Sequence, residues 1–185
     1  MPSEYVRKII ELAGPFRPVE QPTQQDWELA ESELGLVLPS DHKELMASLG
    51  SGEFGAGLFL QNPVSSSDYT RLSSSALNRY RQTVGFLKYH MGITFYPEPE
   101  GLVLVGGIDR QHFLFGPSTK GGKGVSCLVN LDHDCEGLHK ISMSLPRFIY
   151  DLYFGLIPDC WAERLRLSVW FDNTIPFFRA GKEAP

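Results

Sequence analysis

The sequence lacks long hydrophobic runs, and this absence excludes several classes of protein. No apolar segment approaches the roughly 20 residues that are needed to cross a bilayer. The N-terminal segment MPSEYVRKIIELAG is interrupted by charged residues from Glu4 to Glu11, so it has no continuous signal-peptide core. We therefore expect a cytoplasmic protein with no membrane partner.

Cysteine is scarce as well, with three residues in a chain of 185. Cys127, Cys135 and Cys160 form an odd set without a paired spacing, which favours free thiols in a reducing compartment. The hydrophobic fraction of 42% is that of a globular protein, and the length suits one domain with a sizeable core.

An excess of basic charge is also missing. The net charge of -5 argues against nucleic acid as a partner, because counterion release requires a basic face. Between Asp26 and Glu53 there are seven acidic residues and only one basic residue, Lys43. Such a run is often an ordinary solvated surface, and the sharper hypothesis is an acidic surface that attracts a basic protein.

Motifs for nucleotide binding, metal binding and catalysis are missing too. The segment Gly50–Gly55 matches G-x-G-x-x-G in letters, but it follows a predicted helix and precedes a predicted strand, so we interpret it as a turn. The segment Asp132–Glu136, with His139 nearby, is rich in potential ligands but lacks the spacing of a metal site. No nucleophile motif accompanies the cysteines. We expect no enzyme, no cofactor and no metal.

Apolar periodicity and capping residues predict the secondary structure. Thr23-Gln-Gln-Asp26 has the pattern of a capping box before a helix that ends at Gly35, and Ser40 is predicted to cap the next helix. Phe177 and Phe178 are expected to fold back onto the body of the protein. The predicted helices are 4–13, 24–34, 41–49, 77–91 and 145–154, and the predicted strands are 58–60, 102–108, 112–116 and 125–131.

Three parts of this layout occur in a recognisable order. The first contains Leu34-Gly35, Leu38-Pro39 and Gly50-Ser51-Gly52 around a short helix; the others are the strand pair at Gly106-Gly107 and the amphipathic segment SLPRFIYDLYFGL. Together they resemble the SUKH superfamily, which includes bacterial immunity proteins and fungal cell-wall-assembly regulators.

The resemblance implies a fold and a division of the chain. The implied fold is α+β: a single SUKH-like domain whose mainly antiparallel central sheet is packed with flanking helices. The domain is expected to span 24–157. Residues 1–23 would form an N-terminal helix and connector, and residues 158–185 a C-terminal extension that packs on the domain.

The resemblance also implies a function through protein binding. The first hypothesis is a cytoplasmic immunity protein that binds and neutralises a cognate bacterial toxin, such as a basic nuclease. The alternatives are a protein-interaction adaptor of the cell-wall-assembly regulator type, a small-ligand-binding domain and an unrecognised hydrolase. An adaptor would be expected to carry long disordered extensions, and an active site would combine perturbed titratable groups in a cleft.

Candidate partner-binding residues come from the acidic stretch and from the expected turns. A Gly-rich turn could present Glu53 and Phe54 outward, although Phe54 could instead cover the core. Residues at hairpin tips are expected to be polar in any case, which weakens the argument for them. The candidates are Glu31, Glu53, Phe54, Asp109, Arg110, Asp132 and Glu136.

Overall fold

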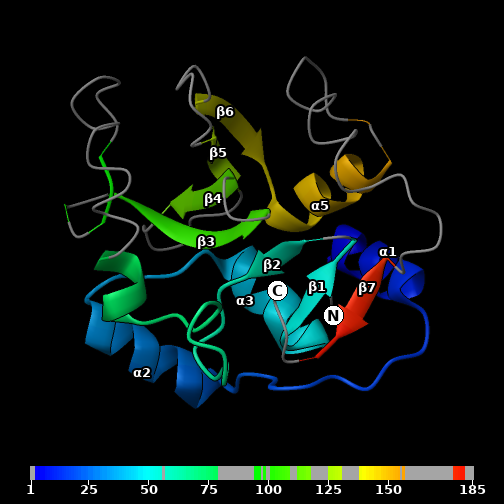
Figure 1. Cartoon of the computed structure of the whole chain (residues 1–185), viewed down its shortest axis with the longest axis horizontal. Coiled ribbons are helices and arrows are strands. Elements are labelled where there is room, and N and C mark those ends of the chain that lie inside the picture. The colour runs from blue at the N-terminus through cyan, green and yellow to red at the C-terminus, as the bar shows by residue number, and fades with distance from the viewer. Residues whose placement is uncertain are drawn as a thin grey trace.

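The computed structural model shows helices and an antiparallel sheet built around one core (Figure 1). No helix among the described residues is long and apolar enough to cross a membrane. The structure describes residues 3–55, 57–78, 94–96, 98, 101–108, 112–117, 125–130, 138–154, 156 and 177–181. The helices are α1 (Glu4–Ala13), α2 (Gln24–Leu34), α3 (Ser40–Leu49) and α5 (Leu145–Tyr153), and residues 74–78 are also helical.

The first two helices follow the sequence pattern. Helix α1 spans the predicted residues and buries Val6 and Ile9 of its apolar stripe. Helix α2 begins with the predicted capping box, in which Thr23 accepts a hydrogen bond from the Asp26 backbone and the Asp26 carboxylate accepts one from the Thr23 backbone. The helix ends at Gly35, whose φ of 65° lies in the left-handed region that glycine adopts without penalty.

Removing the cap of α2 should destabilise the protein. Because the Thr23 hydroxyl satisfies a backbone donor of the first turn, Thr23→Ala is expected to lower the free energy of unfolding by about 1 kcal/mol. Urea denaturation followed by circular dichroism would measure this change. Thr23→Ser retains the hydroxyl and serves as the control. Equal stability of the two variants would contradict a role for the cap.

Helix α3 corrects one expectation about capping. Ser40 is the first helical residue rather than the cap, Pro39 holds the N-cap position, and no side chain makes a capping hydrogen bond there. At its other end α3 stops at Gly50, as predicted. Gly50 has a φ of 71°, and a Cβ at this position would collide with the carbonyl group of Val19. Glycine is therefore required by the close approach of the connector as well as by the backbone angle.

The sheet has seven strands in the order β6-β5-β4-β3-β2-β1-β7, and every neighbouring pair is antiparallel. The predicted hairpin is confirmed as the pair β3–β4. The strands are β1 (Gly52–Phe54), β2 (Leu58–Leu60), β3 (Leu102–Ile108), β4 (His112–Pro117), β5 (Val125–Asn130), β6 (Leu138–Met143) and β7 (Phe178–Ala180).

Strand β1 replaces the turn that was expected after Gly50. It pairs with β2 on one side and with β7 on the other, so residues near the C-terminus complete its hydrogen bonding. A segment rich in glycine can form a strand when both of its neighbours supply backbone partners. Phe177 and Phe178 are 5% exposed, which confirms that they fold back onto the protein.

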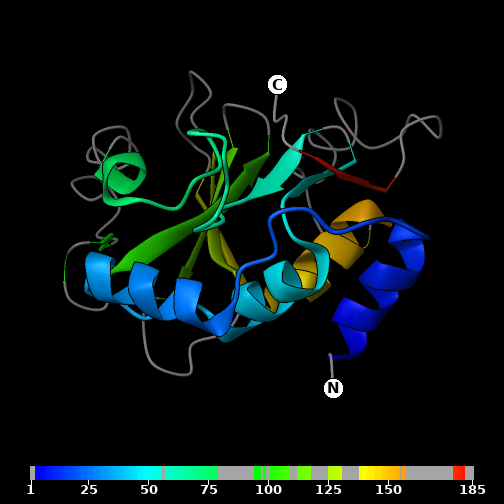
Figure 2. The same cartoon turned by 90° about the horizontal axis from the view of Figure 1, so that it is seen from below.

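The four named helices lie on one face of the sheet (Figure 2). Helix α1 packs against α3 and α5, and its buried residues belong to the same core as those of the central segment. Strand β7 also joins this core through Phe178. Four residues of α2 and α3 are buried in this core: Trp27, Leu34, Leu45 and Leu49.

Two buried polar side chains fix distant segments to one another. Asp41, 5% exposed, accepts a hydrogen bond of 2.7 Å from the backbone of Leu145 and thereby joins α3 to the start of α5. Asn62 is fully buried and donates to the carbonyl of Glu20 and to the hydroxyl of Ser51.

The predicted helix 77–91 is described only as far as residue 78, so most of that prediction lies outside the described residues.

Candidate partner-binding site

The acidic stretch does not form one continuous acidic surface. Five of its seven carboxylates are engaged inside the fold or are partly buried, and only two lie exposed on a helix. The engaged or partly buried residues are Asp26, Glu31, Asp41, Glu44 and Glu53, and the exposed ones are Glu28 and Glu33.

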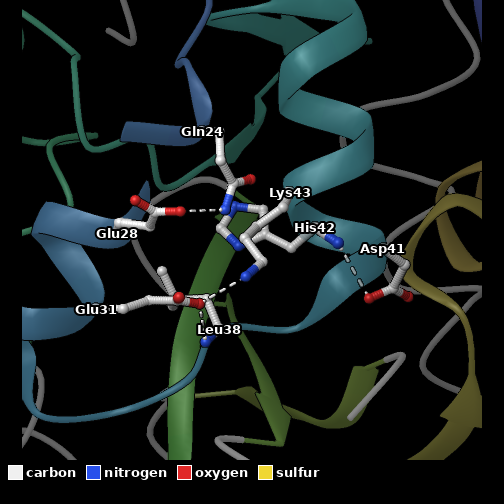
Figure 3. A network of polar contacts seen from close by, with 7 residues as sticks. All are labelled: Gln24, Glu28, Glu31, Leu38, Asp41, His42 and Lys43. Atoms are coloured by element: carbon white, nitrogen blue, oxygen red, sulfur yellow. Dashed lines mark hydrogen bonds and ion pairs between the residues drawn. The ribbon is translucent and has the colours of Figure 1, made fainter. Parts of the chain in front are cut away.

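Glu31 joins α2 to the segment before α3 (Figure 3). Its carboxylate accepts a hydrogen bond of 2.8 Å from the Leu38 backbone and forms an ion pair of 2.7 Å with Lys43. The Glu31 side chain is 18% exposed. Glu31 was a candidate for partner binding, and the structure places it in an internal contact that holds α2 against α3.

Three other carboxylates also have structural partners. The pKa of Asp26 is lowered by its hydrogen bonds to the side chain and backbone of Thr23. Asp41 is buried, as described above, and Glu44 accepts a hydrogen bond from the backbone of Ser3 at the start of α1. These carboxylates stabilise the protein through internal hydrogen bonds, so they do not form a continuous acidic surface for a partner.

What remains is a smaller surface on α2, which we call the α2 outer face. Its central residue is Leu29, which is 60% exposed and is one of the exposed large hydrophobic residues of the described chain. Glu28 and Glu33 flank it, and helix α2 contains no lysine or arginine. The exposed residues of this face are Gln25, Glu28, Leu29, Ser32 and Glu33.

Leu29 was not among the sequence candidates, although a signal for it existed. The apolar stripe of α2 is made by Trp27, Ala30 and Leu34, all buried. Leu29 lies off that stripe, so the helical period alone places it toward solvent. The helical pattern therefore places an apolar side chain at a solvent position between Glu28 and Glu33.

Behind the α2 outer face the helix is held by a buried histidine. His42 of α3 is fully buried, its ring meets the Trp27 ring at a centroid distance of 5.6 Å, and its Nε2 lies 2.7 Å from the carbonyl of Gln61. A carbonyl oxygen only accepts, so Nε2 carries the hydrogen of this contact. Burial lowers the pKa of His42 to about 4, with the Gln61 hydrogen bond opposing the shift.

Glu53 and Phe54 point into different environments. Glu53 is half-buried on β1, opposite Arg179 of β7 in the strand register. Burial raises the pKa of Glu53, and the charge of Arg179 lowers it in part. Phe54 is 2% exposed and contacts the rings of Phe177 and Phe178. The expectation that Phe54 faces a partner is wrong, and its alternative, a core position, is correct.

The remaining candidates lie outside the described residues. These are Asp109 and Arg110 between β3 and β4, and Asp132 and Glu136 between β5 and β6. The ligand-rich segment Asp132–Glu136 lies there as well. Among the residues that the structure does describe, no group of three or more histidine, cysteine, aspartate or glutamate side chains could hold a metal ion.

Comparison with known protein families places part of the chain in a family. The family model described as "SUKH_6: SMI1-KNR4 cell-wall" matches residues 24–149, about two thirds of the chain. The matched region begins at the first residue of α2 and ends within α5, so it contains the α2 outer face. No curated protein and no solved structure gave a significant match.

Proposed function

This chain belongs to the SUKH superfamily, and from that membership we propose that it is an immunity protein that binds and neutralises one cognate bacterial toxin. It would act in the cytoplasm of the cell that makes it, by protein–protein contact. The matched region includes α2, α3 and the strand pair that the resemblance used, and it ends within α5. Family membership is the observation that carries this proposal.

The α2 outer face supports the proposal by its chemistry. Leu29 offers an exposed apolar side chain, and Glu28 and Glu33 place two carboxylates beside it. Protein interfaces combine an apolar centre with a polar rim, and acidic rim groups accelerate encounter with a basic partner. The Glu31–Lys43 ion pair and the buried Trp27 hold α2 in place, so the face is preformed before it binds.

Inhibition by this face requires no catalytic residue. A nuclease toxin holds its anionic substrate with basic side chains, and carboxylates placed against those side chains would compete with the substrate. Leu29 would then occupy an apolar recess of the toxin. This mechanism is steric and electrostatic, and it needs neither a cofactor nor a metal.

Co-expression tests the proposed function. The proposal predicts a toxin gene beside the gene of this chain, and cells that produce that toxin should survive when this chain is co-expressed and should die when it is absent. An unrelated toxin of the same enzymatic class is the control, and the chain should not protect against it. Death in both cases, with the chain folded and abundant, would rule out the immunity function.

A matched pair of charge reversals tests the α2 outer face. Glu33→Lys is expected to weaken binding of the cognate toxin roughly 10-fold, because it places a positive charge against a basic partner. Glu11→Lys makes the same change at another exposed glutamate in the last turn of a helix, α1, and should leave the affinity unchanged. Isothermal titration calorimetry would compare the two. Equal loss in both variants would exclude a specific role for α2.

One alternative function would use the same α2 outer face. An adaptor of the cell-wall-assembly type is favoured by the description of the matching family, which mentions the cell wall. Such an adaptor would bind partners other than a toxin, so co-expression would give no protection.

A further inference from the structure

A second exposed surface lies at the other end of the molecule from α2, where α1 and α5 pack side by side (Figures 1 and 2). The Tyr5 and Tyr150 rings meet edge to face at 5.6 Å, and Phe154 lies 4.7 Å from Tyr150. We call this surface the aromatic face. Its residues are Tyr5, Lys8, Arg147, Tyr150, Phe154 and Leu156.

The aromatic face is exposed at one end. Phe154 is 47% exposed and Leu156 is 61% exposed, and they are two residues apart. With Leu29 on α2, they are the exposed large hydrophobic side chains of the described residues. Single exposed apolar residues are ordinary, but Phe154 packs on the partly exposed Tyr150, and Leu156 follows it two residues further along the chain. Together they form a patch of the kind found at protein interfaces.

The face is also rigid, because its rings continue into the core. Tyr153 packs against Phe154 at 5.1 Å and against Phe177 at 4.6 Å, and Phe177 in turn contacts the buried Phe54. A side chain that is already ordered loses little entropy on binding. Among the residues of the aromatic face, Arg147 lies within the region matched by the family model and the others lie outside it.

The charges on the aromatic face cancel. Lys8 pairs with Glu4 at 2.7 Å, and its Nζ also lies 4.8 Å from the centre of the Tyr5 ring. Arg147 pairs with Asp151 at 3.1 Å. Two ion pairs leave this face neutral, whereas the whole chain carries a net charge of -5. Two copies of the chain would therefore repel each other through the α2 outer face but not through the aromatic face.

We propose that the aromatic face binds the same face of a second copy and forms a two-fold dimer. A two-fold interface joins the same surface of both copies, so that surface must be complementary to itself. A neutral, apolar surface that carries both positive and negative side chains meets this requirement. Two helices of this length present a surface of roughly 300 Å², less than the roughly 800 Å² per partner of a stable complex. The dimer is therefore weak and reversible, and it leaves the α2 outer face free for another partner.

Sedimentation velocity tests the dimer with the full chain. The sedimentation coefficient of the wild type should rise from the monomer to the dimer value as concentration increases through roughly 10–100 µM. The double variant Phe154→Ser/Leu156→Ser should require at least about 10-fold higher concentration, because it removes the exposed apolar side chains. Both residues are exposed, so the variant should fold, and circular dichroism would verify this. Leu29→Ser is the matched control and should dimerise like the wild type.

Three results would overturn the proposal. The first is a wild type that stays monomeric up to about 500 µM, a concentration well above the expected range. The second is a double variant that associates as the wild type does. The third is a control Leu29→Ser that loses association, which would move the contact to α2. None of these results bears on toxin neutralisation, since the dimer is a separate property of the chain.

A charge reversal on the aromatic face tests the role of its neutrality. Lys8→Glu converts the neutral face into one with two excess negative charges, so association should weaken at low salt and recover as salt screens the repulsion. Association of Lys8→Glu that is unchanged at low salt would overturn the role of neutrality.

Discussion

Phe54→Ala should lower the free energy of unfolding by about 3–5 kcal/mol, the range observed when a buried phenylalanine is truncated. Phe54 is 2% exposed and contacts the rings of Phe177 and Phe178. Truncation would leave a cavity where α1, β1 and the C-terminal strand meet, and it would also remove the ring contacts that fix β7. For a chain of this size the loss corresponds to a fall in Tm of roughly 6–20 °C.

Calorimetric melting would measure this effect, with two comparisons. Phe54→Leu fills more of the cavity, so its loss should be clearly smaller than that of Phe54→Ala. Leu29→Ala, at an exposed position of α2, should change stability by no more than about 0.5 kcal/mol. If Phe54→Ala were as stable as Leu29→Ala, the core position of Phe54 would be wrong.

Acidification should destabilise the protein through His42. Its pKa is about 4 in the folded state because the ring is buried, against an ordinary value near 6.5. Above pH 6.5 the ring is neutral in both the folded and the unfolded chain, so it adds no pH dependence. Between pH 6.5 and 4 the unfolded chain binds a proton that the folded chain does not, and stability falls by about 3 kcal/mol.

Urea denaturation at several pH values would isolate this contribution. In His42→Asn the titrating ring is absent, so the loss of stability between pH 6.5 and 4 should shrink by about 3 kcal/mol relative to the wild type. Carboxylates such as Asp26, whose pKa is lowered, also lose stabilising contacts in acid, but they are present in both proteins and cancel in the comparison. Parallel pH profiles for the two proteins would show that His42 is not the buried group that we describe.

The helices could be predicted well from the sequence because the residues that start and end a helix lie next to it in the chain. The capping box at Thr23 and the left-handed Gly35 lie within a few residues of the helix that they bound, and α1 and α2 begin and end where expected. Strand β1 could not be predicted in this way. Its partner β7 lies more than 120 residues further along the chain, and a glycine-rich segment has no intrinsic preference for a strand.

The candidate site was predicted only in part, for a related reason. The acidic stretch was visible, but which carboxylates become internal depends on donors that the fold brings near. The partner of Glu31 is the backbone of Leu38 seven residues away, and that of Asp41 is the backbone of Leu145. Only the role of Asp26 followed from its immediate neighbours. The exposed position of Leu29 follows from the helical period. Its proposed role in binding follows only from the structure, which leaves Glu28 and Glu33 as the exposed carboxylates of the acidic stretch on either side of Leu29.

We propose that this SUKH chain neutralises a toxin by binding it, and calorimetric titration with a toxin encoded beside its gene would test this proposal most directly. We predict saturable one-to-one binding whose affinity falls as salt increases, because the contact pairs an acidic face with a basic partner. Absence of binding at low salt, with both proteins folded, would contradict the account.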